Sequence, residues 1–448
     1  MVDINGPVTE WLLDQLEHIS PDSFSGNTLA LSEWLFGRVL GEREMKEMHA
    51  LLSRPPSTQP RVSTVLLPGI LGSLLASIRG ISATLWYNPT LLLDGHLNLL
   101  DLNDDGTGDR SPDVEIVPVG IEKIYYLKLI IALAQETRLY EFPYDWRRHL
   151  EWNAKVLHDS IQRWSASDPN RRFVLVGHSM GGMLARTYLA LYPREVEERI
   201  ERVVLIGSPI CGVPMAALLF AGGAVHTQII ERLNSSNKAL AFAASCPASY
   251  QLLPAPPDLY RAGSPYPCDW DLYNAAQWGV PGIRQDYLDD ARRFHALLAD
   301  ADPQVEMTQI AGCNKRTLTE IKLSRFDENA PADDPEARAH LTLIHTEDGD
   351  RSGDGTVPLY AARNGDMPLY YVEEGHDGLP GNAKVIDAVL SLIQGQTPAL
   401  PRELPRPSGI LQQLNATSLV QQVADLRRRL ENGDARRDDL IKLFFLDH

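Results

Sequence analysis

Short apolar runs alternate along the chain with longer segments in which apolar residues recur every three or four positions. The runs have the length and β-branched content of buried strands, and they lie at residues 61–67, 138–142, 173–177, 203–207, 305–310 and 369–372. Helical spacing is found at residues 31–52, 120–137, 151–167, 180–192 and 382–394. Strands that alternate with helices form a parallel sheet, because each helix carries the chain back to the start of the next strand. The pattern therefore predicts an α/β fold with a mainly parallel sheet covered by helices on both faces.

Two segments interrupt this alternation. Residues 211–303 carry Pro-rich and aromatic loops and no clear strand, and residues 74–118 separate the first strand from the first helix of the array. Long insertions of this kind usually cover a binding site, since ligands bind at the loops that follow the strands. We expect a central domain at residues 61–395, with a lid at about 74–118 and a cap at about 211–303. Residues 1–60 are expected to form an N-terminal helical segment, and residues 396–448 a Pro-rich linker and a C-terminal helix.

Composition is that of a globular protein and narrows the range of partners. The chain has 448 residues, 44% hydrophobic and 23% charged, with a net charge of −17 and a pI near 5.2. An acidic surface repels polyanions, so no nucleic-acid partner is expected. Four cysteines without a C-x-x-C pair do not make a disulfide framework. The start lacks a secretory signal, and the longest apolar stretch, residues 215–225, is about half of the roughly 20 residues of a membrane span. We therefore expect a cytoplasmic protein.

A serine stands in a Gly-rich turn between a predicted strand and a predicted helix. The turn reads Gly177-His178-Ser179-Met180-Gly181. A G-x-S-x-G turn lifts the serine clear of the sheet, with glycines where a β-carbon would collide. A hydroxyl is a weak nucleophile at neutral pH and needs a base to accept its proton. Ser179 is therefore predicted to be the nucleophile of an α/β-hydrolase.

In that fold the acid and then the histidine follow the serine along the chain. Asp354 lies in a tight loop flanked by glycines, which suits a carboxylate that orients an imidazole, and it is the predicted acid. Asp350 is the first alternative and Asp348 the second. His376 follows the last predicted strand and precedes the final helix, so it is the predicted base. His345 precedes the acid, which is the wrong order for this fold.

The remaining site residues are expected on the neighbouring turns. Acyl transfer requires two backbone N–H groups aimed at the developing oxyanion. Met180, directly after the serine, is expected to supply one, and Ile70, in the turn after the first strand, the other. Contacts with the substrate are expected from Leu71, Trp86 and Met215, although an apolar residue of this kind is equally at home in a packed core.

Together these motifs resemble the lecithin:cholesterol acyltransferase family of α/β-hydrolases, which includes lysosomal phospholipases and plant phospholipid:diacylglycerol acyltransferases. The matching motifs follow one another in the family's order at residues 68–73, 142–147, 177–182, 207–209, 353–358 and 375–378. The resemblance implies Ser179, Asp354 and His376 as a catalytic triad, and Ile70 and Met180 as the oxyanion hole. It also implies a lipid acyl ester as the substrate.

The chain departs from the family at three places. No cysteine lies between residues 1 and 210, where secreted relatives have a lid disulfide, Ile70 replaces the Asp of lysosomal phospholipases, and Ile210-Cys211-Gly212 replaces Trp-Gly-Gly. We therefore expect a serine acyl hydrolase or O-acyltransferase and leave the acyl acceptor open. The alternatives are a small-ester carboxylesterase or thioesterase, and a lipase effector switched by a partner that docks on a helix at residues 411–430. A transient contact of the lid with a membrane surface is compatible with the lipid acyl hydrolase and with the partner-switched lipase. The sequence does not predict an oligomeric state.

Two further motifs are expected to be structural. Residues 144–147 (Tyr-Asp-Trp-Arg) are interpreted as an ion pair and a stacking ring that brace the sheet edge. Residues 101–106 match the first half of a calcium-binding loop, but Pro112 stands where the bidentate Glu would be required. No metal site and no cofactor is expected.

Overall fold

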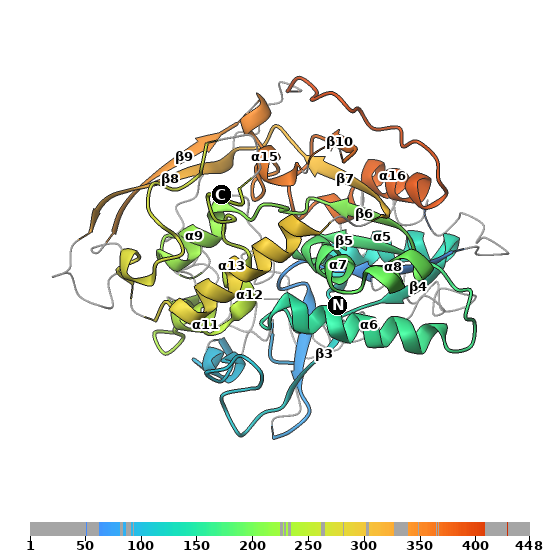
Figure 1. Ribbon diagram of the computed structural model, residues 1–448. Coiled ribbons are helices and arrows are strands. Elements are labelled where there is room, and N and C mark those ends of the chain that lie inside the picture. The colour runs from blue at the N-terminus through green and yellow to red at the C-terminus, as the bar shows by residue number, and fades with distance from the viewer. Residues whose placement is uncertain are drawn as a thin grey trace, which may run out of the picture.

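The centre of the protein is a six-stranded sheet in which every pair of neighbouring strands runs parallel. The structure is a computed structural model that describes Leu51, Arg428 and residues 62–407, apart from 81–83, 87–90, 93, 225–226, 228–229, 232–233, 261–264, 281, 302–303, 327–338, 348, 364 and 366. The strand order is β10-β7-β6-β5-β1-β4 (Figure 1). The strands are β1 (Ser63–Leu67), β4 (Arg138–Glu141), β5 (Phe173–His178), β6 (Ile200–Ile206), β7 (Glu306–Gly312) and β10 (Leu369–Val372).

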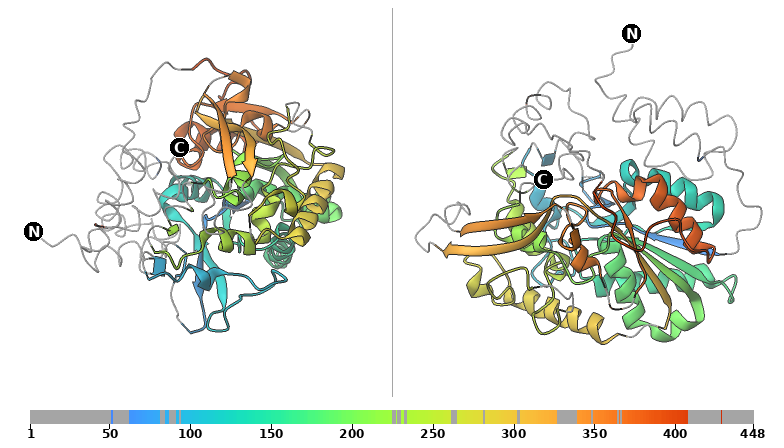
Figure 2. Two further views of the ribbon diagram at one scale, coloured as in Figure 1. Left: turned by 90° about the vertical axis from the view of Figure 1, so that its left-hand side faces the viewer. Right: turned by 90° about the horizontal axis from the view of Figure 1, so that it is seen from above.

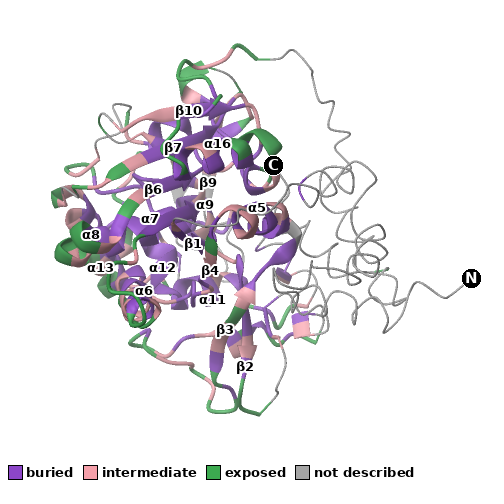
Figure 3. Ribbon diagram, turned by 90° about the vertical axis from the view of Figure 1, so that its right-hand side faces the viewer, coloured by how far each residue is buried: buried purple, intermediate pink, exposed green. Residues whose placement is uncertain are grey.

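Side chains of the central strands alternate between two apolar layers. In β5, Val174 and Val176 pack in one layer, whereas Phe173 and Leu175 pack in the other. Because both layers are apolar, a central strand needs apolar residues at every position, which is why these strands are continuous apolar runs in the sequence. Every residue of β1 and β5 is buried, and Figure 3 shows the middle of the sheet mainly in purple, the colour of buried residues.

Helices cover both faces of this sheet (Figure 2). One layer is formed with α5 (Lys123–Glu136) and α16 (Ala383–Ile393), and the other with α6 (Leu150–Ser165) and α7 (Met180–Leu191). The predicted α/β-hydrolase architecture, with a mainly parallel sheet between helices, is thereby confirmed. Its consequence for function is that the loops after β1, β5, β6, β7 and β10 meet at one edge of the sheet.

Further helices surround this framework. They are α8 (Pro193–Arg199), α9 (Pro214–Phe220), α11 (Ala239–Ser245), α12 (Pro247–Gln251), α13 (Gln285–Asp300), α15 (Leu359–Ala362), η2 (Leu97–Leu100), η3 (Ala275–Gln277), η4 (Gly349–Arg351) and η5 (Leu379–Gly381). Among the described residues 211–303, expected as a cap, the elements are helical and none is a strand. Apart from Leu51 and Arg428, which are both helical, the expected N-terminal helical segment at residues 1–60 and the expected helix at residues 411–430 lie outside the described residues. The domain boundaries remain predictions.

Two antiparallel pairs of strands were not expected from the sequence. The first joins β2 (Ser73–Ser77) to β3 (Ile116–Ile121), so the helical spacing assigned to residues 120–137 begins only at residue 123. The second is the long hairpin of β8 (Thr317–Phe326) and β9 (Ala339–Thr346), which projects from the body of the protein (Figures 1 and 2). Its register shifts twice, between Leu318 and Glu320 and between Leu323 and Arg325, so a two-residue alternation is not maintained and the strand signal is lost.

The described residues contain no helix that combines the length and the apolar character required to cross a bilayer.

Candidate active site

Ser179 lies alone between a strand and a helix. β5 ends at His178 and α7 begins at Met180, and the serine itself has φ 54° and ψ −126°. A residue other than glycine in this region of φ/ψ space costs on the order of 1–3 kcal/mol and is usually found at functional sites. The glycine pattern has a steric cause, because a β-carbon on Gly181 would lie 2.2 Å from the carbonyl oxygen of Leu67. The turn therefore pushes Ser179 out of the sheet while its neighbours pack against the end of β1.

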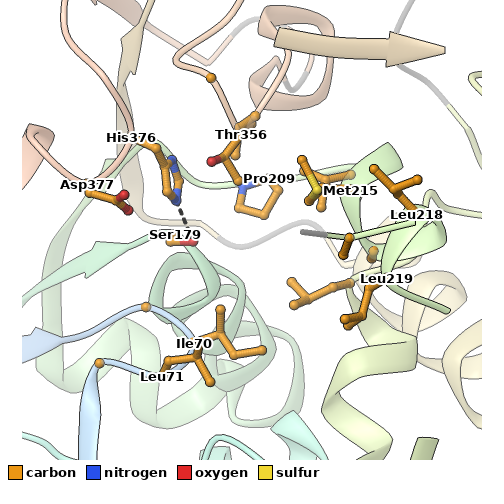
Figure 4. Close-up of a pocket in the computed structure, with 18 of the residues that line it drawn as sticks. Ile70, Leu71, Ser179, Pro209, Met215, Leu218, Leu219, Thr356, His376 and Asp377 are labelled. Atoms are coloured by element: carbon orange, nitrogen blue, oxygen red, sulfur yellow. Dashed lines mark hydrogen bonds between the residues drawn. The ribbon is translucent and has the colours of Figure 1, made fainter. Parts of the chain in front are cut away.

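His376 connects Ser179 to Asp354. Its Nε2 lies 2.9 Å from Oγ of Ser179 and its Nδ1 lies 2.8 Å from Oδ2 of Asp354 (Figure 4). All three side chains are buried. A carboxylate only accepts hydrogen bonds, so Nδ1 carries the proton and Nε2 offers its lone pair to the serine hydroxyl. The arrangement can remove a proton from Ser179 without any further movement.

Asp354 is held rigidly by the backbone of its own loop. Its Oδ1 accepts the N–H groups of Thr356 at 3.0 Å and Val357 at 2.7 Å, which leaves Oδ2 for the imidazole. The carbonyl of Asp354 also accepts the backbone N–H of His376 at 2.8 Å. Asp350, the first alternative acid, is instead three-quarters exposed and pairs with Arg363. Asp348, the second, lies outside the described residues.

The turn after β1 approaches Ser179 closely. A β-carbon on Gly69 would lie 3.0 Å from the Cβ of Ser179, so only glycine allows this approach without displacement. Ile70 and Leu71 line the same cavity as the serine, and Leu71 has a positive φ of 63°. Met180 begins α7, and the N–H groups of a first helical turn have no acceptor within the helix. The two residues expected at the oxyanion hole thus lie on the two turns that converge at Ser179.

Three aromatic side chains fix this turn. Oη of Tyr126 accepts the N–H of Gly69 at 2.8 Å, and Oη of Tyr144 donates to the carbonyl of Pro68 at 2.9 Å. The indole N–H of Trp86 donates to the carbonyl of Leu71 at 3.0 Å. Such contacts compensate the cost of holding Leu71 at a positive φ.

A cavity of about 430 Å³ opens beside Ser179. Figure 4 shows Met215, Leu218 and Leu219 of α9 across the cavity from His376, with Ile70 and Leu71 below. The polar residues of the lining include Arg316, which directly precedes β8, and His345 of β9. Asp377, which follows His376 in the chain, also lines the cavity. The lining is otherwise largely apolar, which suits a hydrocarbon chain.

Trp86 is the exception among the expected substrate contacts. It is 2% exposed, is absent from the cavity lining, and packs edge-to-face on Trp146 at a centroid distance of 5.0 Å. We therefore correct its expected role: Trp86 supports the turn that carries Leu71. Leu71 and Met215, the other two expected contacts, do line the cavity.

Comparison with known proteins supports a family relationship. The family model "Lecithin:cholesterol acyltransferase" matches residues 131–321, a little under half of the chain. "Lecithin-cholesterol acyltransferase-like 4" of Arabidopsis thaliana is 22% identical, with 49% of each chain covered. The match thus spans about half the length of that curated relative. Over residues 131–321, this chain is similar to the lecithin:cholesterol acyltransferase family.

Solved structures resemble this chain only distantly. The Tle4-Tli4 complex contains a chain that is 15% identical, with a TM-score of 0.46, and 75% of this chain and 99% of that chain are covered. The mature lipase BlEst2 of Bacillus licheniformis is 13% identical, with a TM-score of 0.39 and 76% and 94% covered. The fold assignment accordingly rests on the strand order and connections described above.

The Tyr144–Arg147 motif is buried and is connected to the expected lid. Arg147 is fully buried and forms two hydrogen bonds with Asp145, at 2.8 and 2.7 Å. It also pairs with Asp109 at 3.0 Å and donates to the carbonyl of Leu100 at 2.8 Å. Burial alone would lower the pKa of the guanidinium, but the two carboxylates outweigh it and raise the pKa. The interpretation as a brace of the sheet edge is therefore too narrow, because Leu100 and Asp109 belong to the segment expected as a lid.

The loop at residues 101–106 is closed by its own hydrogen bonds. Asn103 and Asp105 both accept the N–H of Thr107, and the hydroxyl of Thr107 donates to Asp105. No group of three or more His, Cys, Asp or Glu side chains is placed to hold a metal ion in the part of the chain that the structure describes. The four cysteines are all free and buried.

Two residues at the site have no role predicted from the sequence. Tyr126, on α5, and His178, directly before the serine, form a hydrogen bond of 2.7 Å between Oη and Nδ1. The geometry of the turn depends on its glycines and does not require a histidine at position 178. A histidine that the turn does not need is a sequence signal for a further role. Tyr126 gives no such signal, because an aromatic residue on an apolar helix is ordinary packing.

Proposed function

We propose that the chain is a serine acyl hydrolase or O-acyltransferase that acts on lipid acyl esters through Ser179, His376 and Asp354. The observation that carries the proposal is the unbroken hydrogen-bonded line of these three side chains beside a largely apolar cavity. The match to the lecithin:cholesterol acyltransferase family supports it, but residues 131–321 include only Ser179 of the three. The roles of Asp354 and His376 therefore rest on geometry.

The chemistry follows from the positions of the donors and acceptors. His376 accepts the proton of Ser179 while Oγ attacks the ester carbonyl carbon, and the carbonyl oxygen becomes an oxyanion. The N–H groups of Ile70 and Met180 are the proposed donors to that oxyanion. His376 then protonates the departing alcohol, and an acyl-enzyme remains on Ser179. Water or a second alcohol accepts the acyl group in the return step, with His376 again as the base.

Labelling with a fluorophosphonate probe tests the nucleophile. Wild-type protein should be labelled covalently, and Ser179→Ala should not be labelled at all. Ser249→Ala is the matched control, because Ser249 is also buried and lines the same cavity. Labelling that persists in Ser179→Ala, or that disappears in Ser249→Ala alone, would overturn the assignment.

A series of nitrophenyl esters separates a lipid acyl hydrolase from a small-ester esterase. The cavity volume and its apolar lining favour long acyl chains, so kcat/KM should rise from acetate to at least octanoate. A maximum of kcat/KM at acetate would favour a small-ester esterase. Products formed from a total lipid extract by wild type and by Ser179→Ala, identified by mass spectrometry, would then reveal the head group and the acyl acceptor.

The β2–β3 pair is the proposed point of transient contact with a lipid surface. Ile78, next to β2, is 61% exposed, and Val119 of β3 is 52% exposed. β2 begins directly after the turn that carries Ile70, so this contact would place the cavity close to the lipid. Ile78→Ser with Val119→Ser should weaken binding to phosphatidylcholine vesicles, whereas Leu191→Ser, at an exposed position of α7, should not. Unchanged vesicle binding by the double variant would contradict the proposal.

A further inference from the structure

A second line of hydrogen bonds runs beside the Ser179–His376–Asp354 line. The N–H of Gly69 donates to Oη of Tyr126 at 2.8 Å, and that hydroxyl lies 2.7 Å from Nδ1 of His178. Nε2 of His178 lies 3.2 Å from the carbonyl oxygen of His376. The line therefore begins on the turn that carries Ile70, passes through α5 and the serine turn, and ends on the backbone of the proposed base.

The direction of each hydrogen bond is fixed by its two ends. A backbone N–H only donates and a carbonyl only accepts, so the oxygen of Tyr126 accepts from Gly69 and Nε2 of His178 donates to His376. The single proton of the Tyr126 hydroxyl then points to Nδ1 of His178, which must be unprotonated. His178 is thus a neutral imidazole with its proton on Nε2, and the line has one consistent arrangement of protons.

Burial favours the same protonation states. Both side chains lie away from water, and burial lowers the pKa of His178 and raises the pKa of Tyr126. The charged group facing His178 during the reaction would be the imidazolium of His376, whose ring centroid is 4.9 Å away. A neutral His178 avoids a repulsion between two cations at that distance.

We propose that Tyr126 and His178 are positioning residues that hold the oxyanion turn and the base at a fixed separation. This rests on the proposed function, because it assigns them a role in the reaction of Ser179. Fixing the N–H of Gly69 orients the Pro68–Gly69 peptide, which directly precedes the peptide that carries the N–H of Ile70. Fixing the carbonyl of His376 orients the backbone from which the imidazole projects. One hydrogen-bonded line thereby sets two parts of the transition-state site that lie on opposite sides of the serine.

Other side chains also hold this turn. Tyr144 and Trp86 donate hydrogen bonds to the carbonyls of Pro68 and Leu71. Tyr126 in addition forms a hydrogen bond with Nδ1 of His178. The proposal therefore distinguishes Tyr126 from its neighbours by coupling to His178, and coupling can be measured.

A double-mutant cycle on the full-length protein is the test. Tyr126→Phe should lower kcat about 10- to 100-fold with KM changed less than about 2-fold, since small displacements of a catalytic group cost up to about 100-fold in rate. His178→Leu should have a similar effect, and His178→Gln, which keeps an acceptor and a donor, should restore part of the lost kcat. Because one line is broken in either case, Tyr126→Phe with His178→Leu should be no slower than the slower single variant. Tyr188→Phe is the control, since the buried hydroxyl of Tyr188 has no hydrogen-bond partner among the described residues.

The outcomes separate the two proposals. Losses that multiply in the double variant, or a rise in KM at unchanged kcat, would overturn the positioning role. If Ser179→Ala abolishes probe labelling while Tyr126→Phe retains full kcat, the positioning role fails and the nucleophile stands. If Ser179→Ala is still labelled, the proposed function fails.

A measurement on the wild type guards against variants that do not fold. Side-chain ¹⁵N NMR of histidine-labelled protein, assigned with His178→Gln, should show Nε2 of His178 protonated and Nδ1 unprotonated at neutral pH. A proton on Nδ1 would overturn the proposal, whatever the variants do.

Discussion

Oδ2 of Asp354 lies 2.8 Å from Nδ1 of His376, while the other oxygen of the same carboxylate is occupied by two backbone N–H groups. Asp354→Asn should preserve the fold but present an amide in place of an acceptor, so His376 would adopt the wrong tautomer. We expect kcat to fall by about 10⁴-fold. Steady-state kinetics, with circular dichroism to verify folding, would check this. Asp350→Asn is the control, and activity lost there but retained in Asp354→Asn would move the acid role to Asp350.

Leu219 lies on the wall of the cavity away from His376 (Figure 4). Leu219→Trp should shorten the space available to an acyl chain without touching Ser179. We expect kcat/KM for nitrophenyl palmitate to fall at least about 10-fold, while the acetate ester reacts at nearly the wild-type rate. Leu191→Trp, on the exposed side of α7, should change neither value. An equal loss for both esters in Leu219→Trp would indicate that the acyl chain lies elsewhere.

Arg147 is a fully buried cation that faces two carboxylates. Arg147→Met should lower the free energy of unfolding by about 3–5 kcal/mol, because Asp145 and Asp109 would remain buried without their partner. The matched surface pair of Arg292 and Asp258 should contribute less than about 1 kcal/mol when Arg292→Met breaks it. Urea unfolding of both variants measures the difference. Similar losses in the two would contradict the role given to burial.

His295 provides a prediction for pH and stability. It is buried, and burial lowers its pKa from 6.5 to about 4. Below pH 6.5 the unfolded chain takes up a proton that the folded chain does not, so stability is lost as the pH falls from 6.5 towards 4. Between pH 7 and pH 4 the wild type should therefore lose about 3 kcal/mol more than His295→Gln. Identical pH profiles for wild type and His295→Gln would contradict the prediction.

The sequence predicts the central sheet well because its inner strands, such as β1 and β5, are buried on both faces. The run at 173–177 corresponds to β5, Phe173–His178, and the run at 369–372 coincides with β10. It does not predict the β8–β9 hairpin, whose bulges interrupt the alternation on which a strand is recognised. Propensity alone therefore misses an element that contributes Leu343 and His345 to the cavity wall.

At the site, residue type and chain order were sufficient to select the three side chains that the structure brings into contact. They were not sufficient for Trp86, because an apolar cluster near a predicted lid can face either the core or the cavity. Tyr126 is 52 residues from its partner His178, and no local pattern links them. Pairings of this kind depend on how α5 packs against the sheet, which only the folded chain determines.

Ser179 and His376 are 197 residues apart in the chain. During synthesis on the ribosome, the serine turn emerges long before the segment that carries its proposed base. In a nascent chain with β5 and α7 already formed, Ser179 would have no proton acceptor. Such a chain would not react with the lipids around it. Activity would therefore appear only after almost the whole described chain had been translated and β10 had joined the sheet, so appearance of probe labelling during translation would report completion of the fold.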